Sequence, residues 1–275
     1  MITATKIAGM GIHYRYFSRS YMLEAQKSVG FSSIELYCGE PHIHISSEGI
    51  ADEKEVIKDI KDSGLQVICV TPDNCMSPWQ YAVRGDTALQ ETKRYFLSTL
   101  DLALTLQCPR VACHSGWGMR NESEKEAWLR SLHFFEWYAE QAADRGIILV
   151  MESLREQESN LVNSLPRLKR YLKELDHPSV QPMIDTCAMA VAGETLEDWF
   201  NAFEGNIQHL HFIDGTPYGH LVWGDGNRSL TDYIETLNKF GYQGYLTQEL
   251  TDNRYYVDPK EADKKSFKAI CQQLD

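Results

Sequence analysis

The sequence contains no long uninterrupted run of apolar residues. No stretch approaches the roughly 18 apolar residues that a membrane-spanning helix requires. Residues 1–6 hold no basic segment that leads into an apolar run, so no signal peptide is expected either. We therefore expect a cytoplasmic protein without a membrane partner.

Paired cysteines and a phosphate-binding loop are also missing. The seven cysteines form no C-x-x-C pair, and their odd number favours reduced thiols over a disulfide framework or a zinc ribbon. The chain has no Gly-rich phosphate loop, which favours an unphosphorylated substrate.

Positive charge is scarce beside negative charge. The chain has 27 Lys and Arg against 39 Asp and Glu, which gives a formal net charge of −12. This surplus argues against a nucleic-acid backbone or an anionic membrane as the main partner. It does not by itself identify a substrate.

Short β-prone segments alternate with helix-length segments along the whole chain. Strands are expected at residues 7–10, 33–37, 66–70, 110–114, 147–152, 180–185, 208–214 and 244–249. Helices are expected near 21–28 and 52–62, from 86 to about 106, near 123–143, after 166, and near 195–203, 229–240 and 259–274. Eight such units in 275 residues predict an α/β protein with a parallel sheet closed into a (β/α)8 TIM barrel, as a single domain over 1–275.

The strand expected at 208–214 carries two imidazoles in an apolar run. His209 and His211 point to the same face because side chains on a strand alternate with period 2. Leu210 and Phe212 point to the other face, where they would pack under a helix. We expect His211 to be a ligand and His209 to lie one layer deeper, as a supporting or core residue.

Four consecutive strands end in a potential metal ligand. Glu152, Asp185, His211 and Glu249 close the strands expected at 147–152, 180–185, 208–214 and 244–249. A parallel barrel brings such residues together at its C-terminal mouth, where three oxygens and one nitrogen could hold one cation. The ligand types suit Mn²⁺, Mg²⁺, Co²⁺ or Zn²⁺ and do not choose among them.

This pattern predicts proton transfer beside a carbonyl. A cation would act as a Lewis acid on the carbonyl and a neighbouring hydroxyl of the substrate. Glu152 and Glu249 could approach from opposite sides, so that one removes a proton and the other returns it with inversion of the carbon.

The four-ligand series resembles the xylose-isomerase-like sugar isomerase and epimerase superfamily. Four local segments are similar to the fructoselysine (psicoselysine) 3-epimerase branch, near D-tagatose 3-epimerase: I-E-L-Y-C-G-E-P-H (34–42), E-S-N-L-V (158–162), D-T-C-A (185–188) and G-Y-Q-G-Y (241–245). The resemblance implies one divalent metal, with Mn²⁺ expected ahead of Co²⁺, Mg²⁺, Zn²⁺ and Ni²⁺. It also implies a sugar substrate and a homo-oligomer, a dimer or tetramer.

The resemblance also assigns roles to residues. Glu152, Asp185, His211 and Glu249 match the metal ligands, and Glu152 and Glu249 match the acid/base pair that acts at C3 of a ketose or ketosamine. Glu158 matches a residue that binds substrate near O1 and O2, with an exposed loop acid as the alternative. The chain departs from the ketose epimerases in having Ala188 in place of a His, and from the family in having W-G-D-G (223–226) in place of Pro-Gly-x-Gly.

Three further histidines are candidate substrate contacts. His114 ends a strand, His42 follows Pro41 after another, and His220 lies in the loop after His211. The alternatives are a structural role for His114, a loop-bracing hydrogen bond for His42 and a solvated position for His220. Tyr37, Trp117 and Trp223 could form an apolar wall or simply pack, and His133 and His177 are expected to be structural.

We therefore expect an epimerase that inverts C3 of a ketose or ketosamine such as fructoselysine. An aldose–ketose isomerase and an inosose dehydratase would use the same site, and the sequence does not separate them. Endonuclease-IV-like DNA repair needs more metal ligands and a basic groove, which the net charge of −12 disfavours. A sugar-binding barrel without catalysis is disfavoured because all four ligands are present.

Overall fold

The fold is a closed eight-stranded parallel barrel, as the sequence predicts. The computed structural model describes residues 2–75 and 78–274. Around the barrel, each strand pairs with the next and β10 returns to β1. The strands are β1 (Ile7–Met10), β2 (Ser33–Cys38), β5 (Gln66–Pro72), β6 (Arg110–His114), β7 (Ile148–Glu152), β8 (Val180–Asp185), β9 (His209–His211) and β10 (Leu246–Gln248).

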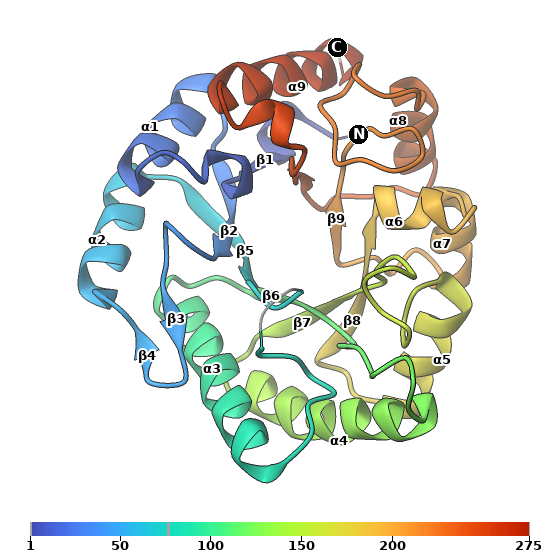
Figure 1. Cartoon of the computed structure of the whole chain (residues 1–275). Helices are drawn as coiled ribbons and strands as arrows, with labels where there is room; N and C mark the ends of the chain where they lie inside the picture. Colours follow the sequence, from blue (N-terminus) through green and yellow to red (C-terminus); the bar gives the residue numbers. More distant parts are fainter. Residues whose placement is uncertain (1, 76–77, 275) are drawn as a thin grey trace.

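A ring of helices surrounds the barrel (Figure 1). They are α1 (Arg19–Val29), α2 (Glu53–Ser63), α3 (Asp86–Thr105), α4 (Glu124–Ala143), α5 (Leu165–Leu175), α6 (Thr186–Val191), α7 (Leu196–Ala202), α8 (Leu230–Lys239) and α9 (Pro259–Leu274). A small hairpin, β3 (Ile45–Ser46) with β4 (Gly49–Ile50), lies beside α3 and was not expected from the sequence. Within the described ranges, no helix is both long and apolar enough to cross a membrane.

Local sequence sets the ends of several helices. The Ser123 hydroxyl accepts a hydrogen bond from the Glu126 N–H at the start of α4, and Thr195 and Asp198 form a capping box at the start of α7. These side chains satisfy N–H groups that have no partner inside a helix. Gly64, which adopts a left-handed conformation with φ 70°, ends α2.

Two strands are at least three residues shorter than predicted. The segment expected at 208–214 is a strand only over His209–His211, because Asp214 makes other contacts. Its backbone pairs with Leu221 in both directions at 3.0 Å, and its carboxylate accepts hydrogen bonds from the N–H groups of Gly224, Gly226 and Arg228. Glu249 likewise follows β10 instead of ending it. The chain therefore leaves the barrel soon after each ligand.

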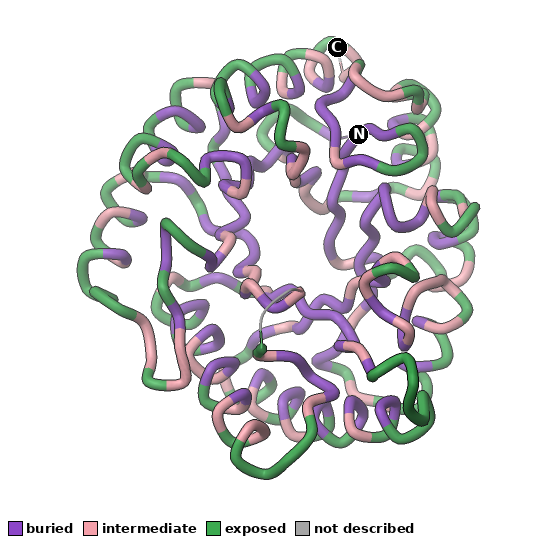
Figure 2. Tube along the Cα trace, in the orientation of Figure 1, coloured by how far each residue is buried: buried purple, intermediate pink, exposed green. Residues whose placement is uncertain are grey.

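The alternation along each strand divides the barrel into two faces. Outward residues such as Leu210 pack into the main core between barrel and helices, and the Phe212 ring lies tilted against the Trp223 ring, with 4.7 Å between ring centroids. Inside the barrel, a separate apolar cluster includes Ala8, Val150 and Met183. Figure 2 shows the barrel wall and inner helix faces buried, with the exposed residues on the outer faces. Polar residues follow the apolar cluster along the strands toward their C-terminal ends.

Candidate metal centre

The structure brings the four predicted ligands together at the C-terminal ends of adjacent strands. One ligand atom from each of Glu152, Asp185, His211 and Glu249 lies within 4.8 Å of all the others. Asp185 pairs with His211 across β8 and β9, which sets these two side chains side by side. The carboxylate of Asp185 also accepts a hydrogen bond from the Ala188 N–H at 2.6 Å, so it is fixed by the first turn of α6.

His211 presents an unbonded nitrogen to the three carboxylates. Its Nδ1 lies 3.0 Å from Glu249 Oε2, 3.2 Å from Glu152 Oε1 and 3.6 Å from Asp185 Oδ2. This nitrogen is buried and makes no hydrogen bond to any residue in 2–75 or 78–274. A buried polar atom without a partner is costly. A divalent cation would satisfy it and the three carboxylates at once, so the residues fit such an ion.

The carboxylates crowd one another electrostatically. Burial raises the pKa of Glu152 to about 7; His211 opposes this rise, and the charges of Glu249 and Asp185 add to it. Like charges held this close disfavour one another's ionised forms. A bound cation would remove that penalty. The cluster is therefore more favourable with a cation bound than without one.

A cavity of about 290 Å³ opens above this cluster. Its volume is near the lower end of the roughly 300–1,000 Å³ of small-molecule sites. The sequence-predicted residues that line it are Glu152, Asp185, Glu249, Glu158, His114 and His220. Tyr37 and Ala188 line it too, whereas Trp223 is buried against Phe212 and Trp117 lines a different surface hollow.

His220 lies against two of the metal-site carboxylates. Its Nε2 is 3.1 Å from Asp185 Oδ2 and 3.3 Å from Glu249 Oε2. Burial lowers the pKa of His220, but the negative charges of Asp185 and Glu249 outweigh burial and raise it to about 9. His220 is therefore a cavity residue, not a solvated one.

His114 lines the cavity with both ring nitrogens occupied. Its Nδ1 accepts a hydrogen bond from the Gly116 N–H at 3.0 Å, so Nε2 carries the proton and donates to Asn74 Oδ1 at 2.8 Å. Burial lowers the pKa of His114 to about 4. The side chain is thus a neutral, fixed part of the cavity wall.

Glu158 is held by a partner that sequence reasoning missed. Its carboxylate forms a two-pronged ion pair with the Arg155 guanidinium, which in turn lies 4.1 Å from the centre of the Tyr218 ring. All three residues line the cavity. Arg155 follows Glu152 by three residues in the same loop, and this position was the sequence signal that could have identified it as a cavity residue.

His42 is the predicted site residue that the structure does not bring to the cavity. Among the described residues that line the cavity, His42 is not included. Its Nε2 lies 3.0 Å from the Phe17 carbonyl oxygen. The Arg19 guanidinium donates to the backbone oxygen of His42 at 2.8 Å. These contacts are the loop-bracing alternative, so the expected substrate contact of His42 is not found here.

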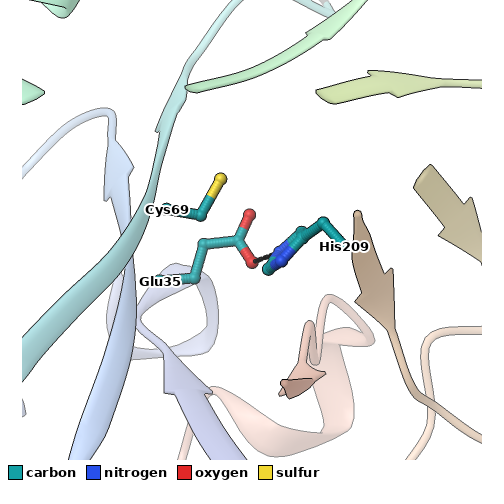
Figure 3. A group of neighbouring side chains, drawn as sticks. All are labelled: Glu35, Cys69 and His209. Carbon is teal, nitrogen blue, oxygen red and sulfur yellow. Dashed lines mark hydrogen bonds and ion pairs between the residues drawn. The ribbon is translucent and has the colours of Figure 1, made fainter. Parts of the chain in front are cut away.

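Glu35 is a second residue that sequence reasoning missed. It lies below the ligands, bonded to both histidines of β9: Oε2 is 2.5 Å from His209 Nε2, and Oε1 is 3.0 Å from His211 Nε2. Burial alone raises the pKa of Glu35, but the two imidazoles hold it well below its ordinary value. The prediction that His209 lies one layer below His211 agrees with this arrangement, which Figure 3 shows in part.

Fold and site together define a single barrel with a candidate metal centre at its mouth. A family model described as "Xylose isomerase-like TIM barrel" matches residues 23–273, so the chain belongs to this family. The resemblance seen in the sequence is thereby confirmed.

Curated relatives and solved structures agree with this assignment. Fructoselysine 3-epimerase from Escherichia coli O157:H7 is 24% identical over 237 residues, covering 84% of this chain and 85% of the relative. D-psicose 3-epimerase from Agrobacterium fabrum is 24% identical over 238 residues, covering 81% and 80%. The structure of 3-keto-D-glucoside 4-epimerase from E. coli, in its apo form, superposes with a TM-score of 0.78 at 18% identity, covering 98% of this chain and 99% of that one.

Metal binding should stabilise the chain through Asp185. We expect the melting temperature of chelator-treated protein to rise on addition of Mn²⁺ or Co²⁺, because a ligand at 100 times its Kd stabilises the fold by about 2.7 kcal/mol. Asp185→Asn should lose most of this rise while keeping an oxygen to cap α6. Asp73→Asn, which changes another carboxylate of the cavity, is the matched control. Equal rises in both variants would contradict the assignment of Asp185.

Burial of His114 should make the fold sensitive to acid. The unfolded chain protonates this ring near its ordinary pKa of about 6.5, whereas the folded chain resists protonation down to about 4. Between these values the unfolded state binds more protons, so the contribution of His114 to stability falls as the pH falls. Urea unfolding of metal-free protein should show the free-energy gap between wild type and His114→Gln shrinking from about pH 7.5 to about pH 5. A constant gap would contradict a buried neutral ring.

Proposed function

We propose that this chain is a divalent-metal-dependent epimerase that inverts C3 of a ketose or ketosamine, such as fructoselysine. The observation that carries the proposal is the arrangement of two carboxylates, Glu152 and Glu249, at the cavity floor. Their side chains are 16% and 15% exposed, whereas those of Asp185 and His211 are 2% and 1% exposed. Of the four ligands, these two therefore reach furthest into the space that a substrate would fill.

The two carboxylates approach from different parts of the barrel. Glu152 ends β7 and Glu249 follows β10, and β8 and β9 lie between these strands. A substrate carbon held between them would face one carboxylate on each side. Glu152 or Glu249 could then remove the proton from one face while the other delivers a proton to the opposite face, which inverts the carbon.

The chemistry at the carbon requires a base and a stabilised oxygen. A divalent cation held by the four ligands would polarise the carbonyl and stabilise the charge that develops on its oxygen. Glu152 suits the role of proton carrier because its carboxylate, with the side chain 16% exposed, reaches the cavity where the substrate carbon would lie. The rest of the cavity supplies polar groups for the hydroxyls of a sugar, notably Glu158, Arg155 and His220.

The relatives support a reaction at C3. Two of those named above are, by their names, epimerases of fructoselysine and D-psicose at that carbon. Ala188, which by resemblance stands where the ketose epimerases have a His, lines the cavity with a smaller side chain than a His. This difference favours a substrate that carries an additional substituent, as a ketosamine does.

The remaining features of the proposal follow from ligand type and resemblance. Three carboxylates and one imidazole suit Mn²⁺, which we propose as the bound ion, and Co²⁺, Mg²⁺, Zn²⁺ and Ni²⁺ are the alternatives for a metal titration to compare. We also propose a cytoplasmic homo-oligomer, dimer or tetramer, whose size equilibrium sedimentation would measure.

Proton NMR in D₂O should separate epimerisation from its rivals. With metal-loaded protein and a panel of fructoselysine, psicose, tagatose, ribulose and hydroxypyruvate, we expect exchange of the C3 proton and growth of a C3 epimer. Exchange at C1 with an aldose product would instead indicate an isomerase, and elimination of water a dehydratase.

Replacement of one carboxylate should block inversion but leave exchange. In Glu249→Gln at saturating metal, epimer formation should fall at least about 100-fold, the lower bound for loss of an acid or base catalyst. The epimer whose proton Glu152 removes should still exchange that proton with solvent. Glu156→Gln, in an exposed loop acid, is the matched control and should keep full turnover. Unchanged epimer formation in Glu249→Gln would contradict the two-carboxylate mechanism.

A further inference from the structure

A fully buried carboxylate lies beneath the metal centre and contacts the metal-site histidine from behind. Glu35, on β2, reaches across the barrel interior to the histidines of β9. Figure 3 shows its side chain pointing at His209, with Cys69 next to the Glu35 carboxylate. Its Oε1 is 3.0 Å from Nε2 of His211, on the side of that ring away from Glu152 and Glu249.

This contact determines which nitrogen of His211 carries the proton. An ionised carboxylate only accepts hydrogen bonds, so Nε2 of His211 must be the donor to Glu35. A neutral imidazole has one N–H, which leaves a free electron pair on Nδ1. That is the nitrogen directed at Glu152, Asp185 and Glu249, at 3.0 to 3.6 Å.

Glu35 is itself held by two further hydrogen bonds. The Thr71 hydroxyl on β5 donates to Oε1, and His209 bonds to Oε2 at 2.5 Å. The side chains of Glu35, His209 and His211 are at most 1% exposed, so water does not compete for these bonds. Three strands, β2, β5 and β9, thus contribute to the orientation of one ring.

A second cation site in the same layer is the rival interpretation. Glu35, Cys69 and His209 offer ligand atoms that lie within 4.8 Å of one another. However, Glu35 and His209 are already bonded to each other, and the Cys69 sulfur lies 3.9 Å from the Val70 carbonyl oxygen. The layer is therefore better described as a hydrogen-bonded support.

We infer that Glu35 is a positioning residue for the metal centre, holding His211 so that its Nδ1 faces the cation site. The inference rests on the metal centre of the proposed function but not on the reaction assigned to it. Residues that orient a metal-binding histidine in this way typically change metal affinity or activity by about 10- to 100-fold when they are replaced.

Metal affinity measured by calorimetry tests this role directly. Glu35→Gln keeps the size of the side chain but replaces one acceptor oxygen by an NH₂ donor. The Gln side chain therefore cannot accept hydrogen bonds from both imidazoles. We expect the Kd for Co²⁺ to rise by about 10- to 100-fold, with a circular dichroism spectrum like that of wild type. Thr71→Val, which removes the hydroxyl that donates to Glu35, should give a smaller rise in the same direction.

Cys69→Ala is the matched control from the same layer. Cys69 makes no hydrogen bond to His211, so its replacement should leave the Kd for Co²⁺ unchanged, with one ion bound per chain. An unchanged Kd in folded Glu35→Gln would overturn the inference. So would two ions per wild-type chain, one of them lost in both Glu35→Gln and Cys69→Ala, because the layer would then be a metal site.

The proton position on His211 gives a readout in the wild-type active site. Nitrogen-15 NMR of Zn²⁺-loaded protein, with the His211 signals assigned by comparison with His211→Gln, should show the proton on Nε2 and Zn²⁺ on Nδ1. In Glu35→Gln we expect this preference to weaken, an effect that a general loss of stability would not produce. In Zn²⁺-loaded wild type, a proton on Nδ1 of His211 with Zn²⁺ on Nε2 would overturn the inference even if Glu35→Gln does not fold. Failure of the epimerase proposal would appear separately, as absent turnover with normal metal binding and the expected proton position.

Discussion

The structure depends on the electrostatics of three carboxylates that converge on one buried imidazole nitrogen. Burying like charges together is unfavourable unless a counter-charge accompanies them. In this barrel burial, with the charges of Glu249 and Asp185 added, raises the pKa of Glu152, and Nδ1 of His211 lies among the carboxylates without a hydrogen bond. A divalent cation would relieve both, so the cluster fits a metal centre whose ligands the fold positions beforehand.

The period of the β-strand explains how the fold builds this centre in layers. Within β9, Leu210 faces the helices while His209 and His211 face the interior, one above the other. Met183 on β8 pairs with His209 on β9, two residues before the Asp185–His211 pair, so the apolar residues and the Glu35–His209 hydrogen bond both lie beneath the ligands. From this position Glu35 contacts the His211 ring, so the orientation of that ligand is set below the cavity.

Sequence reasoning found what is encoded locally. The barrel and the convergence of the four candidate ligands were predictable because each candidate follows an apolar strand in its own segment. Glu35 was not, because its bond to His209 joins residues 174 positions apart and depends on barrel closure. His42 follows a strand, as the residues that line the cavity do. What distinguishes it is its contact with the Phe17 carbonyl oxygen across a loop, which the sequence pattern does not reveal. The early exit of the chain at Asp214 depends likewise on loop contacts that no strand pattern reveals.

The position of a bound ion tests the central claim most directly. Crystals of the protein soaked in Zn²⁺ would be measured at the zinc absorption edge, where an anomalous difference map locates the ion without assumptions about its ligands. The account predicts one peak, about 2.0–2.1 Å from Nδ1 of His211 and about 2.0–2.2 Å from carboxylate oxygens of Glu152, Asp185 and Glu249. A peak among Glu35, Cys69 and His209, or a map without a peak at the four ligands, would contradict it.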